Sequence, residues 1–302
     1  MGDLIGVASA LGAALCWTVA SALWRRLPTS LGPARLNLLK NLLALGFQLP
    51  LVLVLTLSGR QLPAPPGAVV LLLLSGVVGI ALGDSFFFAA LRRLGTRRTL
   101  TFDAGGPAVT AAAGAVLLAE VPAPRQWLGI GLISLAVLLV ARQKPDSGRL
   151  GPGAGVVPTG GQPEGVVCAL AALLCGAGGA LLARAALRTV TLSPLQAATI
   201  RLGAAALVLL PLLGRLPPPG RLPLPAQRRW PLLLTATLLG TSAGIVLQQL
   251  ALDRLEGGLA VALLATAPVM AVPLAPLEGD RPGAVGVLAA ALALLGVALV
   301  AL

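Results

Sequence analysis

Four ionisable side chains stand inside long apolar runs of this sequence: Lys40, Asp84, Asp103 and Arg201. A charge near the centre of a bilayer costs at least about 2.5 kcal/mol and is seldom kept without a polar cavity or a partner. If the apolar runs cross a membrane, these four residues are the first candidates for a substrate or proton pathway.

Each acidic residue has a functional and a structural interpretation. Asp84 could carry a proton or bind an amine on a substrate, or it could be a carboxylate neutralised by Arg92, Arg93 or Lys40. Asp103 could also lie on the pathway, although a solvated carboxylate favoured by the dipole at a helix start explains it as well.

Lys40 and Arg201 could hold a substrate carboxylate or phosphate, or extend to the lipid headgroups. Two uncharged amides, Gln248 and Gln249, could bind substrate or tie helices together. Pro107 and Pro268 each remove a backbone hydrogen bond, so we expect hinges or cavity lining there. The small-residue pairs expected to let helices approach closely, as static contacts or as sliding surfaces, are Gly79 with Gly83 and Gly240 with Gly244.

The composition places the chain in lipid rather than in water. Hydrophobic residues make up 57% of its 302 residues and charged residues only 11%, too few to cover a soluble globule. Apolar stretches such as 69–78 lack the alternation that a membrane barrel requires, so the spans are helical. Runs long enough to cross the hydrocarbon core fall near 4–24, 34–57, 67–91, 99–119, 125–141, 165–187, 194–214, 230–252, 258–277 and 283–301.

The net charge of +12 does not indicate nucleic-acid binding here, because most Lys and Arg residues lie between the spans. They are topology signals and contacts to membrane lipids. The three cysteines, Cys16, Cys168 and Cys175, lie in apolar runs without metal-ligand spacing, and the chain has no histidine. We therefore expect no metal, no cofactor and no enzymatic activity.

The chain repeats itself. An offset of 161 residues superimposes Lys40 on Arg201, Gly79 on Gly240, Gly83 on Gly244 and Pro107 on Pro268, among other Gly, Pro and charged pairs. We expect one five-helix repeat over 1–141, a Gly/Pro-rich linker over 142–164, and a second five-helix repeat over 165–302.

Because five spans is an odd number, the second repeat must enter the membrane upside down. The charges support this: the loop after the third span carries Arg92, Arg93, Arg97 and Arg98, whereas its counterpart carries only Arg254. Counted by side, the basic residues put both termini outside the cell.

In these features the chain resembles the EamA-type members of the drug/metabolite transporter superfamily. The similarity rests on a basic residue early in each second span, a Gly-led third span ending in Ala-Leu, a proline in each fourth span, an acidic residue closing it (Glu120, Glu278), and a glycine-bearing fifth span. The resemblance implies ten helices in two inverted repeats around a central cavity, in the cytoplasmic membrane.

The resemblance implies a role in moving amino acids, nucleotide-related compounds, sugars or drugs, and it does not choose among them. We expect secondary active transport, in the direction of export, of small metabolites such as amino acids or related compounds. Alternating access by the inverted halves is the expected mechanism, with a proton as a candidate coupling ion. A passive channel or a lipid-binding scaffold is the alternative. The expected partners are membrane lipids and a small-molecule substrate. Whether the protein also forms a homodimer is left open.

Overall fold

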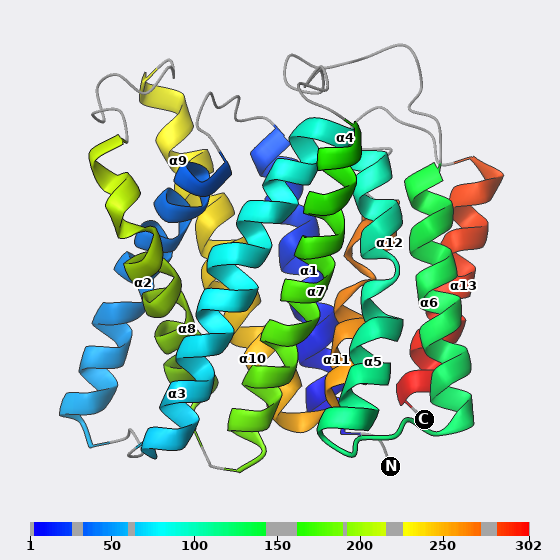
Figure 1. Cartoon of the computed structure of the whole chain (residues 1–302), viewed down its shortest axis with the longest axis horizontal. Coiled ribbons are helices and arrows are strands. Elements are labelled where there is room, and N and C mark those ends of the chain that lie inside the picture. Colours follow the sequence, from blue (N-terminus) through cyan, green and yellow to red (C-terminus); the bar gives the residue numbers. More distant parts are fainter. Residues whose placement is uncertain are drawn as a thin grey trace.

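The computed structural model describes residues 3–25, 33–59, 64–142, 162–189, 192–215, 226–272 and 283–301. Within these ranges the chain is helical, with short turns and no strand, as expected (Figure 1). The predicted linker at 142–164 lies largely outside the described residues, and its boundaries stay a prediction.

The first half contains five spans in chain order. They are α1 (Leu4–Arg25), α2 (Pro33–Leu57), a long third span made of α3 (Pro66–Ser75), η1 (Gly76–Asp84) and the start of α4 (Ser85–Asp103), a fourth completed by α5 (Gly106–Leu117), and α6 (Pro124–Arg142).

The second half repeats this order. It contains α7 (Gln162–Leu187), α8 (Pro194–Leu209) with η2 (Leu210–Arg215), a third span of α9 (Ala226–Thr237), η4 (Leu238–Ala243) and α10 (Gly244–Arg254), then α11 (Gly257–Leu264), α12 (Ala267–Met270) and α13 (Ala284–Ala301).

Prolines and one capping box fix several helix starts. Pro33, Pro66, Pro124 and Pro194 each begin a helix, where a missing N–H costs nothing and the fixed φ angle fits. Ser193 caps α8: its hydroxyl accepts from the Gln196 N–H, and the Gln196 side chain accepts from the Ser193 N–H. The starts of these helices are therefore set by residues at the start of each helix itself.

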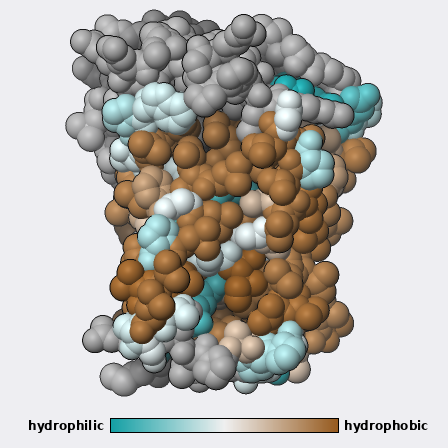
Figure 2. Space-filling view, turned by 90° about the vertical axis from the view of Figure 1, so that its left-hand side faces the viewer, coloured by the Kyte–Doolittle hydropathy of each residue, from teal (hydrophilic) through white to brown (hydrophobic). Residues whose placement is uncertain are grey.

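Nine helices in the described ranges are long and apolar enough to cross a membrane. The predicted ninth span, 258–277, appears as a shorter apolar segment, Gly257–Met270, beyond which 273–282 lie outside the described residues. Large apolar side chains cover the outside, and Figure 2 shows one face as a broad band of hydrophobic residues, with hydrophilic residues towards its upper and lower edges and in recesses between the helices. A lipid environment explains such a surface.

The two halves run in opposite directions. Figure 1 shows both termini at one face, whereas α6 ends and α7 begins at the opposite face. The inverted two-repeat architecture is confirmed. Which face lies outside the cell stays a prediction.

The third span of each half widens at the same place. A π-helical segment covers Gly76–Asp84 in the first half and Leu238–Ala243 in the second. With the 161-residue offset these segments overlap. Such widened turns interrupt the regular hydrogen-bond ladder and occur often at functional sites.

The halves also exchange their first helices. α1 packs against η4 and α10 of the second half, and α7 packs against η1 and α4 of the first. Trp17 Nε1 donates to the Gly240 carbonyl oxygen at 2.9 Å, and Ser75 Oγ donates to the Gly179 carbonyl oxygen at 2.5 Å. The repeats are therefore interleaved rather than side by side.

Both fourth spans break one turn before their proline. Turns at 104–105 and 265–266 interrupt them, and Pro107 and Pro268 lie in the first turn of the helix that resumes. The sequence predicted a lost backbone hydrogen bond at each proline, and the structure has the interruption just before it. The helix ends before the residue whose N–H is missing, so the strain is avoided.

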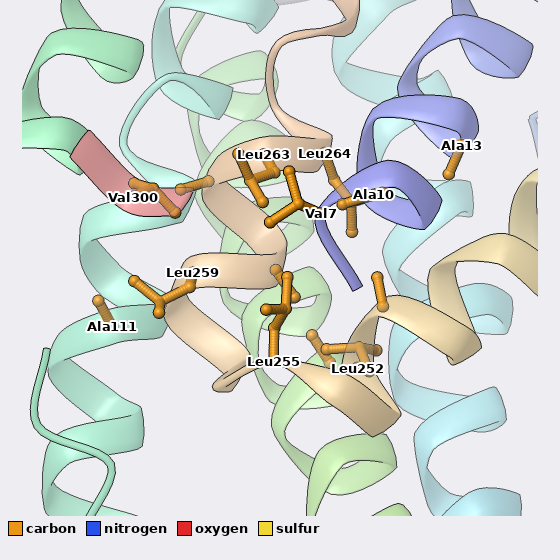
Figure 3. Close-up of a cluster of buried hydrophobic side chains, with 14 of the residues drawn as sticks. Val7, Ala10, Ala13, Ala111, Leu252, Leu255, Leu259, Leu263, Leu264 and Val300 are labelled. Carbon is orange, nitrogen blue, oxygen red and sulfur yellow. The ribbon is translucent and has the colours of Figure 1, made fainter. Parts of the chain in front are cut away.

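The main apolar core joins the halves on the termini side. Figure 3 shows Val7 of α1 meeting Leu263 and Leu264 of α11, with Leu252 and Leu255 below them. All five side chains are buried. This end of the molecule is tightly packed.

The fifth spans, α6 and α13, touch backbone to backbone at two glycines. A Cβ atom on Gly129 would lie 2.7 Å from the Gly296 carbonyl oxygen, and one on Gly296 would lie 2.8 Å from the Gly129 carbonyl oxygen. Neither distance leaves room for a side chain.

We predict that Gly129→Ala lowers the apparent Tm of the detergent-solubilised protein, because the new methyl group forces α6 from α13 at a cost of about 1–3 kcal/mol. Gly131→Ala is the matched control, since a Cβ there meets nothing within 4 Å. Equal thermal stability of the two variants would contradict this packing.

Candidate functional site

The centre of the site is an ion pair between α2 and the end of η1. Lys40 Nζ donates to Asp84 Oδ2, and its ammonium group lies 5.7 Å from the ring centroid of Phe88. Lys40 is 8% exposed, whereas 35% of the Asp84 side chain is exposed. Of the three neutralising partners considered for Asp84, the structure therefore selects Lys40.

Asn37, three residues before Lys40, holds the widened turn beside this pair. Its Nδ2 donates to the Ile80 carbonyl oxygen at 2.7 Å and to Ser85 Oγ at 3.1 Å. The amide thereby binds a carbonyl of the π-helical segment. Asn41 Nδ2 in turn donates to Asn37 Oδ1 at 3.3 Å, and Asn41 Oδ1 is buried without a partner.

Arg201 of α8 also packs against η1 and is 3% exposed. Its Nη1 donates to Gln248 Oε1 at 3.2 Å, and its Nε is buried without a partner. Its guanidinium lies beside Gly79 of η1, the segment that ends at Asp84. Both predicted basic residues and Asp84 therefore belong to one cluster.

Glycines allow α8 to come this close. The backbone of Arg201 abuts Gly76, where any side chain would collide with it, and a Cβ on Gly79 would lie 3.3 Å from Arg201 Nη2. Gly79 also faces Gly179 of α7, and Gly83 faces Cys175. In the second half, Gly240 faces Ala20 and Gly244 faces Trp17, both from α1.

A second polar group lies along the α2–α8 contact. Gln48 Nε2 donates to the Ser242 carbonyl oxygen at 3.3 Å, and Thr199 Oγ1 donates to Gln48 Oε1 at 3.0 Å. Gln249 is fully buried, and both of its amide atoms lack a partner. Leaving buried polar groups without hydrogen-bond partners costs free energy, so the Gln249 amide is available to bind a further polar group.

The structure leaves Asp103 outside the cluster. It closes α4, is exposed, and has no hydrogen-bond or ion-pair partner among the described residues. Its role on the pathway stays a prediction, as do hinge roles for Pro107 and Pro268.

Sequence inspection missed Asn37, Asn41 and Gln48. Together with Lys40 they mark one face of α2, and this spacing was the available signal.

In the described ranges no group of acidic or cysteine side chains could hold a metal ion.

A separate ionic network closes the termini side. Arg184 Nε donates to Glu120 Oε1 at 2.7 Å, and Arg184 Nη1 donates to the carbonyl oxygens of Leu252 and Asp253, each at 2.9 Å. Glu120 Oε2 accepts from the Gly257 N–H at 2.8 Å. We call these contacts the Arg184 latch, because one guanidinium joins the ends of α5, α7 and α10.

The neighbouring Glu256 adds a second carboxylate. Its Oε2 is buried without a partner. Burial and the nearby Glu120 raise the pKa of Glu256, and Arg184 opposes that rise.

We predict that Arg184→Gln destabilises the protein by about 3 kcal/mol, since it leaves the poorly exposed Glu120 carboxylate without its counter-ion. Arg93→Gln is the control, because the Arg93–Glu164 pair at 3.4 Å is more exposed and such pairs contribute about 0–1 kcal/mol. Unfolding in detergent gives both values. A similar loss in both variants would count against the latch.

Comparison with known proteins agrees with this architecture. The model of the EamA-like transporter family matches residues 4–142 and again residues 163–302. A solved structure, described only as the crystal structure of a protein, shares 18% identity over 97% of this chain and 95% of its own, with a TM-score of 0.73, which shows the fold. The curated proteins contain no match. The family is one of membrane transporters of small molecules. The two matches span nearly the whole sequence and place this chain in the EamA-like transporter family.

Proposed function

We propose that this protein is a secondary active transporter that carries small metabolites, such as amino acids, across the cytoplasmic membrane by alternating access. The observation that carries the proposal is the cluster of two buried cations, Lys40 and Arg201, with the partly exposed Asp84, where the two inverted repeats cross. Charges held at such a depth are expensive and mark the pathway of a polar solute.

Inverted repeats suit alternating access because the two halves present the same contacts to opposite faces. Here α2 packs against η4 and α8 packs against η1, so the second span of each half lies on the third span of the other. A movement of one half against the other that breaks these contacts on one side of the membrane can form the equivalent contacts on the other side.

The Arg184 latch supports a state that is closed on the termini side. Its donors and acceptors come from both halves, so an opening of this face has to break them. The turns at 104–105 and 265–266 are the places where the fourth spans can bend without breaking further helix hydrogen bonds.

Asp84 is the best candidate for proton coupling. Its side chain is partly exposed and it neutralises Lys40. A proton on Asp84 would release Lys40, so protonation and the geometry of the site are linked. Export remains a prediction from the family resemblance, and uptake into inverted membrane vesicles measures it.

Counterflow in proteoliposomes tests the proposed function. A panel of amino acids, nucleotides, sugars and cationic drugs is first screened for thermal stabilisation of the purified protein. Labelled uptake of a stabilising compound should accelerate when the same unlabelled compound fills the vesicles, because a carrier must return through its site. Uptake that is indifferent to internal compound would instead indicate a channel, and no uptake a scaffold.

We predict that Asp84→Asn abolishes uptake driven by a pH gradient while the protein still reaches the membrane, because the amide cannot exchange a proton. Glu164→Gln makes the same chemical change at an exposed carboxylate and should leave uptake unaltered. Transport by Asp84→Asn with the wild-type pH dependence would exclude the proton role.

A further inference from the structure

The two repeats treat their buried cation differently. Lys40 and Arg201 occupy equivalent positions in α2 and α8. Lys40 has an acid in the third span of its own half, Asp84, whereas the position equivalent to Asp84 in the second half is Ile245. Lys40 thus has a carboxylate partner within its own repeat, whereas Arg201 has none at the equivalent position.

Ile245 occupies the place where that second carboxylate would lie. It is 6% exposed and packs in one apolar cluster with Ala198 and Leu202, the α8 residues on either side of Arg201 in sequence. It lies three residues before Gln248, the hydrogen-bond partner of Arg201, on the same stretch of α10. Residues at this spacing share one face of a helix.

The cluster therefore carries a net positive charge. Asp84 is bonded to Lys40, and Arg201 forms no ion pair with any of the described residues. Two cations share one anion. A buried charge that lacks full compensation is strongly destabilising, and a single bound anion would neutralise it.

The donors left free define the anion. Arg201 Nε is buried without a partner, and Gly79, which has no side chain, lies beside Nη2 of the same guanidinium. A guanidinium binds carboxylates through two parallel hydrogen bonds. Gln248 binds Arg201 through its oxygen, so its amide nitrogen is a second donor next to the guanidinium. Because the excess charge is a single unit, a carboxylate fits it better than a doubly charged phosphate monoester.

We propose that Arg201 and Gln248 form a subsite for the carboxylate of the transported solute, that Lys40 and Asp84 remain paired beside it, and that Ile245 keeps the subsite vacant for substrate. This inference rests on the proposed transport function, which it deepens by naming the substrate class. The solute is a small organic molecule with one carboxylate, a class that includes amino acids.

The test measures binding to the purified, full-length protein. The probes are small amino and hydroxy acids, each paired with its amide, together with sugar phosphates. Thermal stabilisation, followed by calorimetry of the stabilising compounds, should show binding of acids and no binding of their amides. Ile245→Asp supplies Arg201 with an internal carboxylate, so it should weaken acid binding at least tenfold, whereas Ile245→Asn changes the same side chain without charge and should retain binding.

Arg201→Gln gives a second test should Ile245→Asp fail to fold, and it should also lose acid binding. The proposal is overturned if amides or sugar phosphates bind as tightly as the acids, if Ile245→Asp binds acids like the wild type, or if no acid stabilises the wild type.

Counterflow separates the two proposals. Acid binding without counterflow would remove the transport function but keep the subsite. Counterflow of a solute that lacks a carboxylate, unchanged in Ile245→Asp, would keep transport and remove the subsite.

Discussion

The constraint on which the site depends is that one carboxylate, Asp84, and a cation from each repeat are gathered at η1. Lys40 is bonded to Asp84, and Arg201 lies beside Gly79 of the same segment. In a bilayer these charges can be kept only if they are brought together away from lipid. Their burial therefore requires α2 and α8 to cross against the third spans, which fixes the arrangement of the two halves.

That crossing depends in turn on backbone features that only particular residues permit. Gly76 and Gly79 let the backbone of Arg201 approach η1, and the π-helical turn frees carbonyl oxygens that Asn37 binds. The same widening at Leu238–Ala243 receives α2 in the second half. The repeats thus share a scaffold, while Asp84 and Ile245 make its two sides chemically different.

Much of this architecture could be predicted from the sequence. The long apolar runs predicted the membrane spans, and the recurring Gly, Pro and charged residues predicted the inverted repeat. Both features could be predicted because they depend on local composition. Lys40 was among three named partners of Asp84, but pattern alone could not select it. The π-helical turns could not be predicted, since tertiary packing decides them. The Arg184 latch joins residues 64 positions apart, and of the two only Glu120 was singled out in the sequence, as the acidic residue that closes a span.

The most direct measurement is a structure of the protein bound to the carboxylate compound that stabilises it best. We predict that the carboxylate of the bound compound lies within hydrogen-bond distance of the Arg201 guanidinium, with Gln248 beside it and Lys40 still paired with Asp84. A ligand bound away from Arg201, or an Asp84 side chain turned to pair with Arg201 in its place, would contradict it.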